Sequence, residues 1–452
     1  MSAVDSAWLR MDQPGNLLVV NAVMWSSQSS DFSALRTTIE QRMINRFPRF
    51  RQYPRPSRLP LVGRAEWVDD DDFDADRHFR HVTLPEPGDE AALQAYVSSQ
   101  SGLPLDPEHP LWEIHLISGY RSGTAALFRL HHAIADGVAL TRVVLSLTDN
   151  GSPDGFAPSH DPSSARSLLD AAGWAAGQGV GLVRHPTRIA GVASTAERDS
   201  KRLAYLAALP PKPKSVLSGA VVPTKLVTWT PPIPLAGIKA VGRLTGTTVN
   251  DVMLSAVAGA LGRYLVGRGT PLDQVRVMVP VNLRPLDAPL PPELGNDFGF
   301  YFVDLPTGDL EPAARLAQMH QRVEAIKGSP EAVVAFGVLA GLGAAPAVVQ
   351  DVGVAFFGSK AAGVVTNVPG PREPVFLAGA RVDGLVGWVP RAGDMGFGVS
   401  IFSYAGEVTV GFSTDAHLIP DPDRLQELVL EEVDLLMQAA DPQADGPGAA
   451  TA

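Results

Sequence analysis

The sequence predicts an α+β protein of two similar halves that are joined by a helical linker. Strand-like and helix-like segments alternate over residues 1–150 and again over residues 215–440, whereas residues 151–214 are rich in alanine, glycine and proline. The chain has 452 residues, and 45% of them are hydrophobic. This length and composition suffice for more than one buried core, so each half is expected to fold around its own.

In the first half, short apolar runs indicate strands, and apolar residues at helical spacing indicate helices. The predicted elements are a strand over Leu17–Trp25, helices over Phe32–Phe47 and Glu90–Ser101, a hairpin of Trp112–Ser118 and Thr124–Leu130, and a helix over Val138–Thr148. The acidic run Asp69–Asp76 has the composition of a solvated surface loop.

The middle of the chain has a different composition. Proline and glycine near Ser152–Ser164 indicate loops, Ala165–Ala208 has the composition of an Ala/Gly-rich helix, and Pro210–Pro213 would end it. The run Gly177–Gly181 looks superficially like a nucleotide-binding loop, but no strand precedes it. Residues 151–214 are therefore predicted to be a linker.

The second half, residues 215–440, repeats the mixture of strands and helices. The predicted elements are a strand over Lys225–Thr230, helices over Leu235–Leu244 and Val249–Leu265, strands over Val275–Val281, Phe298–Leu305 and Gly363–Asn367, a hairpin of Phe397–Tyr404 and Glu407–Ser413, and a helix over Pro422–Met437. The polar tail, residues 441–452, is expected to be disordered.

One apolar segment has to be weighed as a membrane span. Ala332–Val349 is uncharged for 18 residues, the lower limit for a transmembrane helix. Glycines at 337, 341 and 343 and Pro346 interrupt it, so a buried helix is the preferred prediction. A helix that also touches lipid remains the alternative.

Composition excludes several classes of function. The net charge of −11, without a cluster of basic residues, argues against a nucleic-acid binder. The absence of cysteine excludes disulfides, thiolate zinc sites, iron–sulfur clusters and a cysteine nucleophile. Because Met1–Trp8 lacks the pattern of a secretory signal, a cytoplasmic location is expected.

The most informative motif is the run His131-His132-Ala133-Ile134-Ala135-Asp136-Gly137, between a predicted strand and a predicted helix. Adjacent side chains on a strand point to opposite faces, so His131 and His132 are expected to have different roles. One can reach a cleft and act as a general base, since imidazole exchanges protons near neutral pH. A metal site is disfavoured, because the two side chains diverge and the spacing H-x-x-x-H is absent.

Two residues that follow the histidines have structural explanations to weigh. Asp136 precedes the predicted helix, so its carboxylate can cap the free amides there, or it can pair with a cation and fix the turn. Gly137 either allows the backbone to approach a cleft closely or simply suits the start of the helix.

Six sequence blocks, in order, resemble the bacterial wax ester synthase/acyl-CoA:diacylglycerol acyltransferases. The resemblance covers nearly the whole chain apart from the linker and the tail. The blocks are Pro110–Glu113, His131–Gly137, Asn250–Leu254, Val279–Pro285, Leu294–Asn296 and Thr366–Pro371.

The resemblance implies two chloramphenicol-acetyltransferase-like domains with the active site at their interface. It implies transfer of a fatty acyl group from acyl-CoA, a substrate, to diacylglycerol or a long-chain alcohol, without a further cofactor. In such a site His132 would be the base, and Asp136 would turn from the cleft to hold the loop. Arg284, in a matching block, is the expected partner of Asp136, while His131 would pack behind and orient the base.

The resemblance also suggests substrate-binding residues, each with an alternative structural role. Asn250 and Asp251 would bind near the thioester or the acceptor, or would only cap a helix. Trp112 would line the acyl channel, or belong to the core. Asn367 would line the cleft, or only form a rigid turn with the Pro369–Pro371 run.

Other functions remain open. The chain could use another alcohol or a carrier-protein thioester, or it could be a catalytically silent lipid-binding homologue. A serine hydrolase is disfavoured, because no G-x-S-x-G nucleophile turn occurs. Since the expected products are insoluble, peripheral contact with membranes or lipid inclusions is expected. No oligomeric state is predicted.

Overall fold

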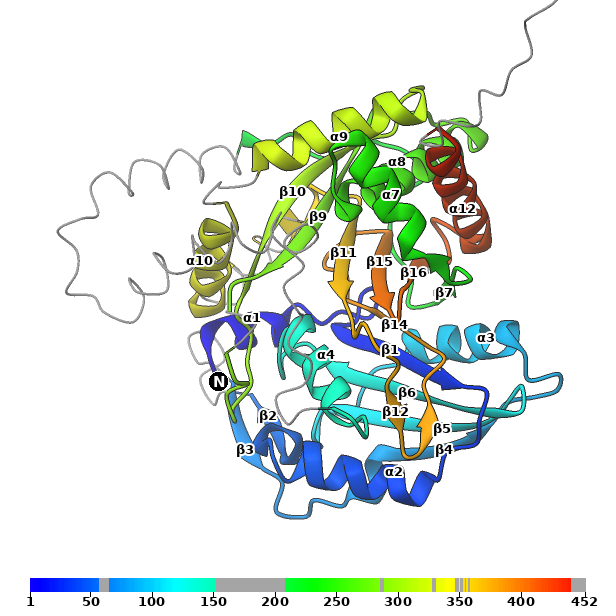
Figure 1. Ribbon diagram of the computed structural model, residues 1–452. Coiled ribbons are helices and arrows are strands. Elements are labelled where there is room, and N and C mark those ends of the chain that lie inside the picture. Colours follow the sequence, from blue (N-terminus) through cyan, green and yellow to red (C-terminus); the bar gives the residue numbers. More distant parts are fainter. Residues whose placement is uncertain are drawn as a thin grey trace, which may run out of the picture.

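The structure is a computed structural model that describes residues 1–56, 65–151, 208–284, 288–326, 331–345, 349, 353, 355–356 and 358–439. Two β-sheets dominate it, each formed mainly by one half of the chain and covered by helices (Figure 1). Most of the predicted linker, with its glycine run, and the predicted tail lie outside the described residues.

The first sheet has five strands in the order β14-β1-β6-β5-β4. Strands β1, β6 and β5 are antiparallel neighbours, and β4 runs parallel to β5. The strands are β1 (Val19–Ser26), β4 (Phe79–Thr83), β5 (Trp112–Tyr120), β6 (Gly123–His131) and β14 (Gly384–Trp388). The accompanying helices are α1 (Ala3–Arg10), α2 (Phe32–Ile39), α3 (Glu90–Ser101) and α4 (Gly137–Ser146).

The first half has further short elements. A π-helix over Glu40–Ile44 follows α2, so the single helix predicted over Phe32–Phe47 changes its hydrogen-bonding pattern part-way and ends earlier. A small sheet pairs β2 (Gln52–Arg55) with β3 (Glu66–Asp69). Two 3₁₀ helices, Pro48–Arg51 and Ala75–His78, lie nearby.

The second sheet runs in the order β10-β9-β11-β15-β16-β7, and the short β8 pairs with β16. Its strands are β7 (Lys225–Trp229), β8 (Ile233–Pro234), β9 (Gln274–Asn282), β10 (Phe298–Pro306), β11 (Gly363–Pro369), β15 (Phe397–Tyr404) and β16 (Glu407–Asp415). Its helices are α7 (Leu235–Thr245), α8 (Val249–Gly267), α9 (Pro312–Ile326), α10 (Glu331–Ala344) and α12 (Pro422–Ala439). A hairpin of β12 (Phe376–Leu377) and β13 (Ala380–Arg381) projects from this half.

One strand from the second half of the chain belongs to the sheet of the first half. Strand β14 comes from the second half of the sequence but pairs antiparallel with β1, so that Val386 lies opposite Val23 in the first sheet. The chain then returns to the second sheet at β15 (Figure 1). The predicted halves, residues 1–150 and 215–440, do not account for this position of β14.

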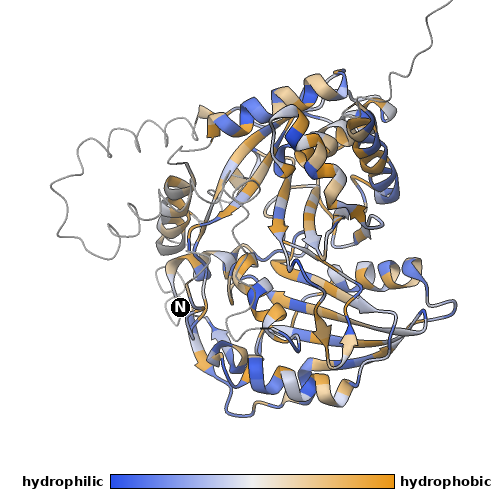
Figure 2. Cartoon of the chain, viewed as in Figure 1, coloured by the Kyte–Doolittle hydropathy of each residue, from blue (hydrophilic) through white to orange (hydrophobic). Residues whose placement is uncertain are grey.

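The helices pack as their hydropathy patterns require. Along α2 and α12, hydrophilic and hydrophobic residues occur together, as expected for helices with one face in the core (Figure 2). α8 is buried along most of its length in the core of the second half. α10 covers most of the apolar run considered above, and its Ala332, Ala335 and Leu339 are buried. Within the described residues, no helix has both the length and the hydropathy needed to span a membrane.

Candidate active site

The histidine motif forms a tight turn between β6 and α4. β6 ends at His131, and α4 begins at Gly137 with Asp136 as its N-cap. The backbone N–H of His132 donates to the carbonyl oxygen of Leu18 over 2.7 Å, which ties the turn to the start of β1. Both histidine side chains are buried, and only His132 is among the residues that line the large cavity described below.

The imidazole of His132 lies in an aromatic environment. Its ring stacks on Trp8 at a centroid distance of 4.4 Å and lies 5.4 Å from the ring of Phe298. The side chain is 4% exposed, and its Nδ1 atom has no hydrogen-bond partner among the described residues. Burial lowers the pKa of His132 to about 4, and the charge of Asp136 opposes this shift only in part. The ring is therefore neutral near pH 7 and able to accept a proton.

His131 is held by the protein. Its Nδ1 accepts a hydrogen bond from the backbone N–H of Ala133 over 3.0 Å, so its proton lies on Nε2. Nε2 lies 3.7 Å from a carboxylate oxygen of Asp12. The other oxygen of Asp12 accepts from the N–H of Leu18. The structure thus places His131 in the frame of the turn, away from the cavity lining.

Asp136 has both of the structural roles that the sequence left open. Its Oδ1 accepts from the N–H of Ala139 over 2.9 Å, which caps α4. Its Oδ2 accepts from the N–H of Asp297 over 3.1 Å and lies 3.8 Å from Nη1 of Arg284. Arg284 also donates to the carbonyl of Gly295. The carboxylate therefore joins the turn in the first half to a loop in the second.

A second connection between the halves reaches His132 itself. The side-chain amide of Asn296 donates to Oδ1 of Asp5 over 2.8 Å and to the carbonyl oxygen of His132 over 2.9 Å. Gly295 has a φ of +98°, which glycine adopts readily, and its N–H donates to the carbonyl of Ile134.

Asp5, Trp8 and Asn296 were missed as candidate site residues. Asn296 stands in one of the six blocks, so the resemblance could have indicated it. Asp5 and Trp8 lie on the short N-terminal helix, which carries no comparable sequence signal.

A large apolar cavity opens beside His132, with a volume of about 1640 Å³ including its open mouth. Both halves contribute to its wall. From the first half come residues of β1, β6 and α4, including Met24, Phe128, Leu130, Leu140 and Val144; from the second come residues of β9, β10, β11, α10 and the segment after β14, including Met278, Phe300, Leu339, Val364 and Met395. Such an apolar space suits long hydrocarbon chains and limits the access of water to the imidazole.

The predicted substrate-binding residues lie in different places. Asn367 lines the cavity, and its amide donates to Oδ1 of Asn250 over 3.0 Å. Asn250 is buried behind it, outside the lining. Thr248 is the N-cap of α8, and Asp251 completes a capping box with it while also contacting Nδ1 of His320 over 2.8 Å.

The structure also gives the contacts of two other predicted site residues, Trp112 and Gly137. Trp112 is 1% exposed, stacks on His78, donates its indole N–H to the carbonyl of Phe50 and does not line the cavity. It is a core residue of the first half, which was the alternative to a channel wall. Gly137 lines the cavity, and a Cβ atom there would lie 3.2 Å from Cγ1 of Val389.

Comparison with known proteins places this geometry in a family. A model described as the wax ester synthase/diacylglycerol acyltransferase catalytic domain matches residues 1–253, and a model of the C-terminal domain of these proteins matches residues 294–437. This chain belongs to the wax ester synthase/diacylglycerol acyltransferase family. The Mycobacterium tuberculosis protein tgs2, named a probable diacylglycerol O-acyltransferase, is 30% identical over 400 residues, which cover 84% of each chain.

Solved structures share the fold. The wax ester synthase/diacylglycerol acyltransferase from Marinobacter aquaeolei VT8 superposes with a TM-score of 0.67 at 22% identity, over 96% of this chain and 98% of that one. The starter condensation domain of rhizomide synthetase, solved in complex with C8-CoA, gives a TM-score of 0.59 at 14% identity, over 98% and 95%. The predicted α+β fold of two chloramphenicol-acetyltransferase-like domains is confirmed.

Proposed function

We propose that this chain is an O-acyltransferase that moves a fatty acyl group from acyl-CoA to a hydroxyl of diacylglycerol or a long-chain alcohol, giving triacylglycerol or wax ester. The observation that carries the proposal is the neutral, buried imidazole of His132 in the wall of a large apolar cavity between the two halves. The names of the family and of its mycobacterial relative supply the substrate classes, and the condensation domain bound to C8-CoA is a precedent for a CoA thioester on this fold.

The proposed reaction is a direct transfer. His132 accepts the proton of the acceptor hydroxyl while its oxygen attacks the thioester carbonyl carbon. The carbon–oxygen ester bond forms, the carbon–sulfur bond breaks, and the imidazolium returns the proton to the departing CoA sulfur. Because an apolar cavity limits access of water, the alcohol competes successfully with hydrolysis. No covalent acyl-enzyme is required.

The surrounding residues would keep the imidazole in position for this step. Asn296 holds the carbonyl of His132 from the second half, and Asp136 holds the turn through Ala139 and Asp297. We propose that these contacts, with Arg284 and His131, keep the base aligned as both substrates enter. Within the described residues, no group of three His, Asp or Glu side chains is arranged to hold a metal ion.

An acceptor panel tests the proposal. Purified protein is incubated with labelled palmitoyl-CoA and a diacylglycerol, a long-chain alcohol or a short-chain alcohol, and both released thiol and lipid product are measured. We expect stoichiometric CoA and ester with the first two acceptors, and formation of both slowed by about 10²–10⁴-fold in His132→Ala. Absence of CoA release with every acceptor contradicts the proposal. Activity only with an acylated carrier protein would instead establish the carrier-dependent alternative.

We also propose peripheral contact with membranes or lipid inclusions, because both proposed products are insoluble in water. α10 supports this proposal: beyond Glu331 it carries no charged residue, its Leu339 lines the cavity, and its Gly337 and Gly341 are exposed. Flotation of the purified protein with lipid droplets or vesicles is the expected result. Recovery of all protein in the lipid-free fraction would refute this part of the proposal.

A further inference from the structure

The segment Val389–Gly396 carries the chain from β14 in the first sheet to β15 in the second. It will be called the crossover segment. Its Val389, Pro390, Ala392 and Met395 line the cavity. Val389 also lies against Gly137 of the histidine turn. The crossover segment is therefore a wall of the cavity close to the proposed base.

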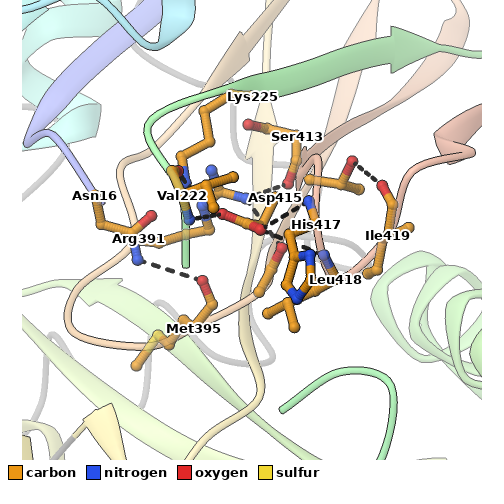
Figure 3. Close-up of polar contacts among 12 residues, drawn as sticks. Asn16, Val222, Lys225, Arg391, Met395, Ser413, Asp415, His417, Leu418 and Ile419 are labelled. Atoms are coloured by element: carbon orange, nitrogen blue, oxygen red, sulfur yellow. Dashed lines mark hydrogen bonds and ion pairs between the residues drawn. The ribbon is translucent and has the colours of Figure 1, made fainter. Parts of the chain in front are cut away.

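A buried cation holds this segment from the side of the second sheet. Arg391 stands between two cavity-lining residues but does not line the cavity itself. Its side chain is 5% exposed, and its Nη1 donates to the carbonyl oxygens of Gly396, over 3.2 Å, and of Ser413, over 2.8 Å (Figure 3). Burial lowers the pKa of Arg391 to about 10, so the guanidinium remains charged at neutral pH.

Asp415 provides the opposite charge at the end of β16. Its Oδ2 accepts from Nζ of Lys225 and from the backbone N–H of Val222, both over 2.8 Å, and its Oδ1 accepts from the N–H of His417 over 3.0 Å (Figure 3). Burial alone would raise the pKa of Asp415, but these hydrogen bonds outweigh it and hold the pKa below its usual value. Asp415 is thus fixed in several directions, and its charge favours the charged form of Arg391.

Other parts of the chain also contact the crossover segment. The amide of Asn16, from the first half, donates to the carbonyl oxygens of Gly393 over 2.7 Å and Met395 over 3.3 Å. Nζ of Lys212, near the end of the predicted linker, contacts the carboxylate of Asp394 over 2.9 Å. Residues from three distant regions therefore contact Arg391, Gly393, Asp394 and Met395 of the crossover segment.

We propose that Arg391 is a positioning residue that sets the shape of the cavity wall and thereby selects the length of the hydrocarbon chains that the enzyme accepts. This inference rests on the proposed function. A buried charge held by hydrogen bonds often adds little net stability, since its desolvation offsets these contacts, whereas it can hold one conformation against others. The crossover segment needs a single conformation, because its cavity-lining side chains must keep contact with substrate and with the histidine turn.

The test compares Arg391→Met with Arg315→Met. Arg315 is a matched control: it is also buried, pairs with Glu432 and donates to the carbonyl of Leu310, but it does not line the cavity or contact the crossover segment. We expect Arg391→Met to change the ratio of kcat/KM for palmitoyl-CoA to that for decanoyl-CoA by about tenfold, as for a change of fit by a methylene or more. Arg315→Met should lower Tm and leave this ratio unchanged. A purely structural role for Arg391 predicts the same result for both variants.

Two milder variants test the inference if Arg391→Met does not fold. Arg391→Lys keeps the charge but not the paired donation to two carbonyls, and Asn16→Ala removes the contacts to Gly393 and Met395. Both should change the ratio in the same direction as Arg391→Met, by a smaller factor. A ratio within about twofold of wild type in all three variants, at equal folded fraction, would overturn the inference.

A binding measurement separates this inference from the proposed function. Fatty acids of 10 and 16 carbons are added to each variant, and the ligand-induced increase in Tm is compared. If wild type releases no CoA but Arg391→Met alters the discrimination between the two acids, the proposed function fails and the inference stands. If wild type is active and neither the discrimination nor the kinetic ratio changes, the inference fails alone.

Discussion

Strand β6 carries the buried ionisable residues Arg129 and His131, and His132 lies directly after its end. Nη1 of Arg129 contacts the carboxylate of Glu113, which lies directly opposite on β5, over 2.7 Å. Glu113 also contacts Arg80 over 2.6 Å and His115 over 3.3 Å. Burial alone would raise the pKa of Glu113, but these partners lower it to about 2. Within the part of the chain that the structure describes, His132 has no ion-pair partner of this kind, and burial dominates its pKa.

The comparison shows what makes a buried ionisable group available for chemistry. Around Arg129 opposite charges lie in contact, so Glu113 and the two arginines keep their ionised forms and their contacts contribute to the fold. Around His132 the balance is left incomplete, so the neutral imidazole persists with a lone pair to offer. The first site predicts losses of stability on mutation, and the second predicts losses of activity.

Removing the imidazole should have the largest effect. His132→Ala is expected to lower kcat by about 10²–10⁴-fold, the usual contribution of a general base, while the protein still folds. Release of CoA thiol from palmitoyl-CoA measures this loss. His115→Gln is the matched control, because His115 is equally buried but belongs to the Glu113 cluster. If His132→Ala retained most of its activity, the assignment of the base would be wrong.

Local sequence patterns predicted most of the regular elements. The helix expected over Glu90–Ser101 has these bounds in the structure, and the two hairpins are β5–β6 and β15–β16. Apolar spacing sufficed there, because each element pairs or packs with a near neighbour in sequence. β14 was not predicted: it has five residues, two of them glycine, and its partner β1 is far away in sequence.

The candidate site was predicted in part. The motif indicated His132 as a cleft residue, and the resemblance indicated the approach of Arg284 to Asp136. Periodicity could not indicate that Trp8 stacks on the imidazole, because this contact depends on how α1 packs against the second half. Neither could it separate the cavity lining from the core, so both roles stayed open for Trp112, which lies in the core and not in the cavity wall.

The Arg129 cluster should respond in stability. Arg129→Met leaves Glu113 with only the exposed Arg80 as an opposing charge, and loss of one partner of a buried pair costs up to about 3–5 kcal/mol of unfolding free energy. Denaturant unfolding measures the change. We expect the kcat of the folded fraction to match that of wild type. A comparable fall in kcat at full folding would mean that the two sites on β6 are not independent.

The connection between Asp136 and Arg284 should have an intermediate effect. Asp136→Asn weakens the contact to Arg284, and loosening of the turn is expected to lower kcat/KM by about tenfold. A double-mutant cycle with Arg284→Met should give a coupling energy of about 1 kcal/mol, since the charged atoms lie 3.8 Å apart. Additive effects of the two substitutions would show that the pair is incidental and that Asp136 acts only as the cap of α4.

The pH dependence should show the smallest effect, and it tests the cause of the neutral imidazole. A base is active when unprotonated, so activity falls as pH drops through its pKa. Because the pKa of His132 is lowered to about 4, kcat/KM should be constant between about pH 6 and pH 8. Trp8→Ala admits water to the ring, which should raise the pKa toward 6.5 and move the acid limb upward by about one unit.

Trp8→Phe separates burial from other effects of the indole. Phenylalanine keeps an aromatic face against His132 and excludes water, so the acid limb should stay where it is in wild type. A limb that moved equally in Trp8→Phe and Trp8→Ala would assign the shift to the indole itself. In that case incomplete charge balance would not explain the difference between His132 and the Arg129 cluster, since the stacked ring would set the pKa of His132.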